Sequence, residues 1–152
     1  MRYLHYTLAT GLGLGYSPVA PGTAGSILAV VSAYFLIKGN IVILLIATLV
    51  VTAIGTYSST FVENDLGSED PSIVVIDEIA GMWISLIFLP VTPWLYLSAF
   101  VLFRLFDVVK PFPINSLQKL PGGWGIMFDD VLAGIYSLLI LQLWLHFFPN
   151  VL

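Results

Sequence analysis

Residues 41–62 read IVILLIATLVVTAIGTYSSTFV, a stretch of 22 positions without a charged side chain. A membrane-spanning helix needs about 20 predominantly apolar residues, so this stretch predicts one crossing. Residues 131–148 predict a second crossing, since they contain no Asp, Glu, Lys or Arg and have only His146 near their end. The composition agrees, because 59% of the chain is hydrophobic and 9% is charged, whereas soluble domains are about 25% charged. We therefore expect residues 1–152 to form a single all-α domain in a membrane.

Three shorter apolar segments extend this prediction. Residues 79–89 and 94–103 flank a Pro90–Pro93 turn, which favours two consecutive helices. Residues 24–37 would form roughly 21 Å of helix, which spans a bilayer only by extending, tilting or thinning it. The alternative for this segment is a re-entrant or interfacial helix. The sequence thus predicts a polytopic bundle of about five hydrophobic helices, of which the first is short.

The charged residues gather on one side of this five-helix arrangement. With the N-terminus inside, four of the five Lys and Arg residues lie on the inner side and Lys38 alone lies outside, as the positive-inside rule requires. All nine acids also fall on the inner side, and the C-terminus falls outside. The chain has no cysteine, which excludes thiolate metal sites and Cys nucleophiles. Its net charge of −4 argues against nucleic acid as a partner.

Two adjacent acid pairs interrupt apolar runs. Asp77–Glu78 and Asp129–Asp130 each stand where an apolar helix is expected to begin. Helix capping explains one such pair, with Asp77 as the N-cap and Glu78 in the first turn. However, Gly81 and Gly134 each follow an acid by four residues, and small residues let membrane helices approach closely. Two helices meeting on these faces would bring four carboxylates together, which favours a site for a hard cation such as Mg²⁺ over capping.

Arg104, Asp107 and Lys110 are spaced three residues apart, so they share one face of a helix. One interpretation is an ion-pair ladder at the membrane edge, with Lys110 extending toward water. The other is a metal ligand, Asp107, beside one or two cations that bind phosphate. The sequence alone leaves both open.

Residues 17–26, SPVAPGTAGS, precede the first apolar helix. Thr23 or Ser26 is expected to cap that helix. The same hydroxyls and the backbone N–H groups of a helix N-terminus also suit a phosphate group. Both interpretations place this segment on the inner side.

Four ordered motifs resemble those of the phosphatidylglycerophosphatase A family. They are SPxxPGTxGS at residues 17–26, DP at 70–71 leading to VIDEIxGMW at 75–83, FRxxDxxKPxP at 103–113, and GGxGIMxDDxxAG at 122–134. The resemblance implies a Mg²⁺-dependent membrane phosphatase of bacterial phospholipid synthesis. Its reaction would convert phosphatidylglycerol phosphate to phosphatidylglycerol and inorganic phosphate. It also implies a multi-pass protein of the bacterial inner membrane, with its active site facing the cytoplasm.

Together, these observations predict the following site. Mg²⁺ would be held by Asp77, Glu78, Asp107, Asp129 and Asp130, and phosphate by Lys110, Arg104, Thr23 and Ser26. Asp70 is predicted either as a ligand or as the acid for the leaving oxygen. The alternatives are a cation-coupled transporter or channel subunit, which would also use intramembrane acids, and a membrane-assembly protein with capped helices. Acids near one face rather than at the midplane favour the phosphatase.

Overall fold

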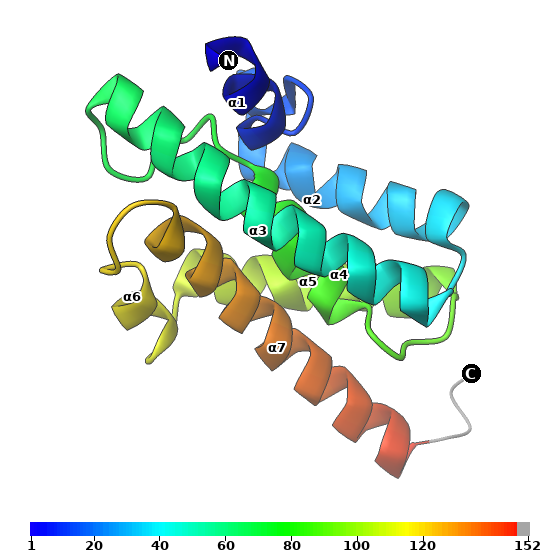
Figure 1. The fold of residues 1–152 in the computed structure, drawn as a ribbon. Helices are drawn as coiled ribbons and strands as arrows, with labels where there is room; N and C mark the ends of the chain where they lie inside the picture. The colour runs from blue at the N-terminus through cyan, green and yellow to red at the C-terminus, as the bar shows by residue number, and fades with distance from the viewer. Residues whose placement is uncertain (149–152) are drawn as a thin grey trace.

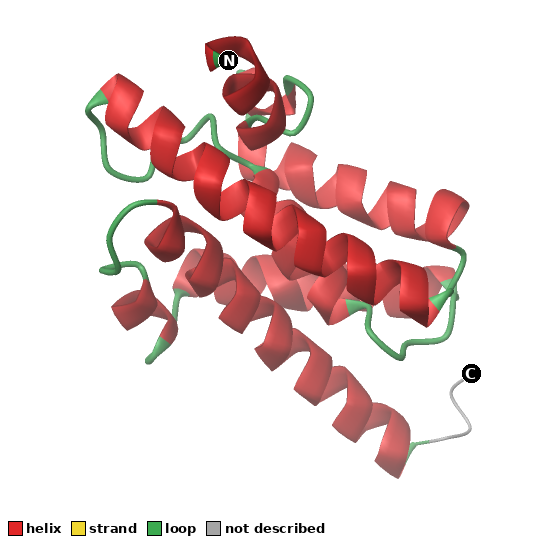
Figure 2. Ribbon diagram, viewed as in Figure 1, coloured by secondary structure: helices red, strands yellow, loops and turns green. Residues whose placement is uncertain are grey.

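The computed structural model describes residues 1–148, and those residues form an all-helical bundle (Figures 1 and 2). In chain order the helices are α1 (Arg2–Ala9), η1 (Leu14–Tyr16), α2 (Pro21–Ser32), η2 (Ala33–Ile37), α3 (Ile41–Leu66), α4 (Ile76–Ser85), α5 (Pro93–Val109), α6 (Ile114–Leu117) and α7 (Gly123–Phe147). The predicted fold class is therefore confirmed as all-α. The C-terminus, predicted to lie outside, falls beyond the described residues.

Two helices are long and apolar enough to cross a membrane. They are α3 and α7, with 26 and 25 residues, or roughly 39 and 38 Å of helix. Helix α3 begins where the Asn40 side chain accepts a hydrogen bond from the Ile43 N–H, and it ends at Gly67 in the left-handed conformation. The helices α2 and η2 together form a shorter apolar helix. Among residues 1–148 two helices pass this test, so five crossings stay a prediction.

Helix α4 lies at the centre of the bundle and contacts α2, α3, α5 and α7. Eight of its ten residues are buried, including Met82. On the side of α2, α5 and α7, Met82, Leu86 and Phe103 belong to one large core cluster. A smaller cluster, which includes Val62 and Met127, joins α1, α3 and α7. Because α4 is enclosed in this way, the side chains of its first turn are held inside the protein.

Helix α7 starts eight residues earlier than the predicted crossing. Its N-cap is Gly122, so Asp129–Asp130 lie inside the helix and the prediction that they open it is wrong. The glycines at the start of this helix pack tightly against neighbouring backbone. A Cβ on Gly123 would overlap the Thr56 carbonyl of α3, and one on Gly125 would overlap the Leu120 carbonyl.

Two capping predictions are also wrong. The N-cap of α4 is Val75, so Asp77 and Glu78 both lie in the first turn. The N-cap of α2 is Ala20, so Thr23 and Ser26 lie within the helix rather than at its cap. Pro21 fixes this earlier start, because its backbone angle suits the first helical position and it has no N–H to satisfy.

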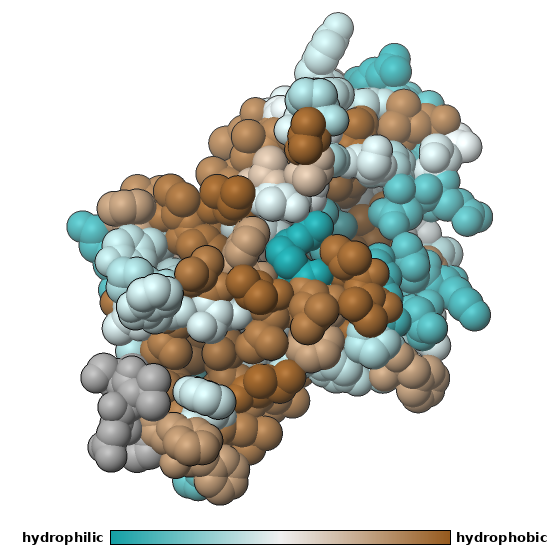
Figure 3. Space-filling model, turned by 180° about the vertical axis from the view of Figure 1, so that it is seen from behind, coloured by the Kyte–Doolittle hydropathy of each residue, from teal (hydrophilic) through white to brown (hydrophobic). Residues whose placement is uncertain are grey.

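Hydrophilic residues gather along one edge of the molecule in the view from behind, and hydrophobic residues cover much of the remaining surface (Figure 3). The ends of α3 and α5, the short α6 and the start of α7 lie together at this edge (Figure 1). The α2–α3 loop, which carries Lys38, lies at the opposite edge. The polar groups available for chemistry are therefore concentrated at one end of the bundle.

Candidate active site

Three carboxylates from two helices converge inside the bundle. Asp77 and Glu78 come from the first turn of α4, and Asp130 comes from the second turn of α7. One oxygen from each lies within 4.8 Å of the others. Asp77 and Asp130 are only 8% and 2% exposed. Buried like charges repel, and a nearby cation would relieve this repulsion.

The same trio has oxygens without partners. Asp77 Oδ1, Glu78 Oε2 and Asp130 Oδ2 are buried and have no hydrogen-bond partner among residues 1–148. Buried polar atoms are nearly always hydrogen-bonded or bound to an ion, so these oxygens require an explanation. Carboxylate oxygens are the ligands that Mg²⁺ prefers. The trio therefore fits a small divalent cation.

Two glycines bring these helices together. A Cβ on Gly81 of α4 would overlap the Asp130 carbonyl of α7, and a Cβ on Gly134 of α7 would overlap the Gly81 carbonyl. The predicted close approach of the two acid-bearing faces is therefore confirmed. It brings Asp130 to Asp77 and Glu78, because each acid lies one turn before its glycine.

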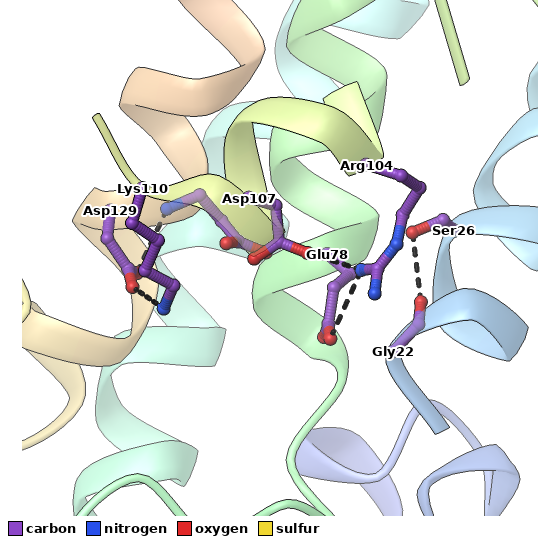
Figure 4. Close-up of polar contacts among 8 residues, drawn as sticks. Gly22, Ser26, Glu78, Arg104, Asp107, Lys110 and Asp129 are labelled. Atoms are coloured by element: carbon purple, nitrogen blue, oxygen red, sulfur yellow. Dashed lines mark hydrogen bonds and ion pairs between the residues drawn. The ribbon is translucent and has the colours of Figure 1, made fainter. Parts of the chain in front are cut away.

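Lys110 and Asp129 form an ion pair across α5 and α7, with Lys110 Nζ 2.5 Å from Asp129 Oδ2 (Figure 4). Asp129 is buried. Lys110 follows the last residue of α5 and takes a left-handed backbone conformation with φ 46°. Burial opposes the charged form of Lys110, but the hydrogen bond and charge of Asp129 outweigh it, so the pKa of Lys110 is raised. The ammonium group is therefore held at the site in its charged form.

Arg104 lies between two carboxylates, as Figure 4 shows. Its Nη1 forms an ion pair with Asp107, one turn along α5, and lies 3.8 Å from Glu78 Oε1. The ion pair predicted between Arg104 and Asp107 is thus confirmed, whereas Lys110 pairs with Asp129 instead of extending the ladder. About a fifth of the Arg104 side chain is exposed. Arg104 therefore compensates part of the negative charge and still borders solvent.

The start of α2 lies against the same group. A Cβ on Gly22 would overlap Glu78 Oε1 and lie 3.1 Å from Arg104 Nη1. The buried Ser26 hydroxyl donates to the Gly22 carbonyl at 2.9 Å (Figure 4), and Thr23 lies half-buried in the same helix. The sequence prediction named Thr23 and Ser26 but missed Gly22. The sequence did contain a signal for Gly22, because a glycine stands at the start of a helix although glycine is a poor helix former.

Asp70 lies outside the carboxylate trio. It is exposed on the α3–α4 connection, has φ 46°, and accepts a hydrogen bond from Gln118 Nε2 at 3.0 Å. It lines a polar cleft of about 740 Å³ together with Glu63, Glu69 and residues of the 115–122 segment. The structure therefore brings together Asp77, Glu78 and Asp130, with Arg104, Asp107, Lys110 and Asp129 around them, and leaves Asp70 at the surface.

The family model described as Phosphatidylglycerophosphatase A matches residues 7–145, which is most of the chain. The chain belongs to this family. Two relatives carry the name phosphatidylglycerophosphatase A. The Escherichia coli protein is 38% identical and covers 95% of this chain and 85% of its own length. The Haemophilus influenzae protein is 39% identical, with 92% and 90% covered.

A third relative, from Bacteroides thetaiotaomicron, is 42% identical over 91% of this chain and 92% of its own length. It carries the name "Putative phosphatidylinositol-3-phosphatase". No solved structure matches the chain significantly. Family membership identifies the chain as a phosphatase enzyme rather than as the transporter, channel subunit or assembly protein considered above.

Proposed function

We propose that the protein hydrolyses the terminal phosphomonoester of phosphatidylglycerol phosphate in a Mg²⁺-dependent reaction at the bacterial inner membrane. Family membership supports the phosphatase activity, and the names of two relatives support the lipid. The observation that carries the metal dependence is the buried trio with three unpartnered oxygens. A site made only of carboxylate oxygens favours Mg²⁺ over softer metals.

Asp77, Glu78 and Asp130 would hold the metal. When bound, Mg²⁺ would neutralise the phosphate oxygens and make water a better nucleophile. Asp107 and Asp129, both predicted as ligands, have cationic partners in Arg104 and Lys110. We therefore give them a supporting role, in which they hold these two cations beside the phosphate.

Lys110 and Arg104 are the proposed phosphate-binding groups. Their side chains are 24% and 20% exposed, so both border solvent while remaining fixed by carboxylates. An anionic phosphate at this border would accept hydrogen bonds from both. Of the two roles predicted for Asp70, its position outside the trio favours that of an acid for the leaving oxygen. No residue is singled out as a covalent nucleophile, which favours attack by water.

The proposed location follows from the apolar helices and the polar edge. α3 and α7 would cross the membrane, with the shorter helices completing a multi-pass bundle. The polar edge would face the cytoplasm, as the predicted distribution of Lys and Arg requires. Acyl chains would then remain in the bilayer while the head group reaches the carboxylates.

Phosphatidylinositol 3-phosphate is the second candidate substrate. The observation that favours it is the name of the Bacteroides relative, which is 42% identical to this chain. The two candidates share a phosphomonoester on the alcohol head group of a lipid. The proposed chemistry is therefore the same for both, and a direct comparison of the two lipids decides between them.

The experiment is phosphate release from the purified protein in detergent. Both lipids and soluble phosphomonoesters are compared, with Mg²⁺ or with a chelator. We expect chelation to stop release, and Asp77→Asn and Asp130→Asn each to lower it about 100-fold or more, since even second-layer changes cost 10–100-fold at metal sites. Asp65→Asn is the matched control, because Asp65 contacts Tyr6 and Arg2 rather than the trio. Release that persists with a chelator would refute the metal dependence, and no release from any lipid phosphate would refute the function.

A further inference from the structure

One face of α5 carries large apolar side chains that no other helix covers. Five of them are at least half exposed and recur every three or four residues, namely Trp94, Leu97, Val101, Leu105 and Val108. This spacing places them in one stripe along the helix. Within the described residues 1–148, this stripe is a continuous apolar surface about four turns of α5 long.

The stripe leads to the proposed phosphate-binding cations. Arg104 follows Val101 by three residues and precedes Val108 by four, so it lies at the border of the stripe. Its guanidinium turns inward to Asp107 and Glu78. Lys110 follows the last residue of the same helix. An apolar stripe that is bordered by one cation and followed by another complements a molecule with an apolar chain and an anionic head.

The opposite end of the stripe opens into a groove between α5 and α7. The groove has a volume of about 750 Å³ and is lined almost entirely by apolar side chains. Leu97 and Val101 line it from α5, and Ile140 and Trp144 line it from α7. Leu97 lies seven residues before Arg104, or roughly 10 Å along the helix. With the polar edge at the membrane surface, the groove therefore lies deeper in the bilayer than the cations, where the acyl chain of a bound lipid would lie.

From these observations we propose that the exposed stripe of α5 and the α5–α7 groove bind an acyl chain of the lipid phosphate. The proposal rests on the proposed function, because it takes the carboxylate trio as the place where the phosphate reacts. It assigns the binding of an acyl chain to apolar residues that have no role in the proposed reaction. It also gives the lipid a lateral route from the bilayer to Arg104.

A second apolar groove, between α3 and α7, fits this role less well. It is larger, about 890 Å³, and is lined by Leu49, Trp124 and Phe128 among others. Its α7 residues lie on a different face of the helix from Asp130 and Gly134, which face α4. A chain in that groove would lie on a different face of α7 from the Asp130 carboxylate. The two grooves therefore provide matched positions for a test.

The test compares Leu97→Trp with Leu49→Trp, which place the same bulky apolar side chain in the α5–α7 and α3–α7 grooves. For each protein, kcat/KM is measured with long-chain phosphatidylglycerol phosphate in mixed micelles and with its short-chain, water-soluble analogue. We expect the long-chain to short-chain ratio to fall at least fivefold in Leu97→Trp and to stay at the wild-type value in Leu49→Trp. Val101→Trp, which fills the same α5–α7 groove from the next turn, is measured in parallel in case Leu97→Trp does not fold.

An unchanged ratio in the folded α5 variants, or an equal fall in Leu49→Trp, would overturn the proposal. Wild-type protein that hydrolyses neither lipid would instead refute the proposed function. The two failures are therefore distinguishable.

Discussion

Gly81 of α4 and Gly134 of α7 meet so closely that a Cβ on Gly134 would overlap the carbonyl of Gly81. This contact is a close approach between the two acid-bearing helices. It depends on the absence of side chains and not on hydrogen bonds between polar groups. Any larger residue at either position must push α7 away from α4, and Asp130 would move with it.

We therefore expect Gly134→Ala to destabilise the protein by about 1–3 kcal/mol, the usual cost of overpacking. Metal-dependent activity should fall by more than this loss explains, because Asp130 no longer reaches Asp77 and Glu78. Unfolding in detergent and a Mg²⁺ titration of activity measure the two effects. A variant with wild-type Mg²⁺ dependence would show that the close contact does not position the carboxylates.

Gly22 and Gly25 allow a similar comparison on α2. A Cβ on Gly22 would overlap Glu78 Oε1, whereas a Cβ on Gly25 would press on Val75, 3.0 Å away. Both alanine variants should cost about 1–3 kcal/mol of stability. Only Gly22→Ala should also raise the Mg²⁺ concentration needed for half-maximal activity, by about 10-fold as for other groups that support metal ligands. Equal Mg²⁺ dependence in the two variants would count against a positioning role for Gly22.

The raised pKa of Lys110 predicts its behaviour with pH. A Lys whose pKa is higher in the folded protein than in the unfolded chain stabilises the fold below the unfolded value of about 10.4. That contribution is lost only as the pH rises through the folded pKa. Lys110 should therefore stay charged from about pH 6 to 10. We expect Lys110→Arg, whose charge does not titrate in this range, to have a pH–rate profile of the same shape as wild type.

Lys110→Met removes the charge instead. It leaves the buried Asp129 carboxylate without its partner, which should cost about 1–3 kcal/mol of stability. The KM for the lipid phosphate should also rise, because one of the two proposed phosphate-binding cations is gone. Activity assays and thermal unfolding in detergent check both outcomes. A variant that keeps the wild-type KM would remove Lys110 from the phosphate site.

The variant Ser26→Ala distinguishes two roles of the Ser26 hydroxyl, a hydrogen bond within α2 and the predicted binding of phosphate. In the structure this hydroxyl donates to the Gly22 carbonyl of its own helix, a bond that contributes little to helix stability. We expect less than about 1 kcal/mol of destabilisation and a KM within twofold of wild type. A large rise in KM would instead support the phosphate-binding role predicted from the sequence.

Much of the architecture was predictable because long apolar runs are such a direct signal. Residues 41–62 lie within α3, and both acid pairs were placed at the same polar edge. The pairing of Gly81 with Gly134 was also foreseen from spacing alone. The start of α7 was not, since Gly122–Gly125 has the composition of a turn. Tertiary packing of Gly123 against Thr56 overrides that local preference.

The detailed arrangement of the site was less predictable. Spacing placed Arg104, Asp107 and Lys110 on one helical face, but α5 ends at Val109. The left-handed turn at Lys110 then redirects its side chain to Asp129 of another helix. Which carboxylates remain unpaired depends on these contacts between helices. A one-dimensional pattern cannot distinguish Asp129, which has a cation, from Asp130, which has none among the described residues.

The position of Asp130 on α7 has a consequence for biosynthesis. Two members of the carboxylate trio are translated more than 50 residues before the third, and α7 is the final helix of the described chain. A nascent protein that ends before Gly123 carries Asp77 and Glu78 alone. The carboxylate trio therefore exists only after α7 has been made and has packed against α4, so we expect chains that end before Gly123 to lack the proposed metal site.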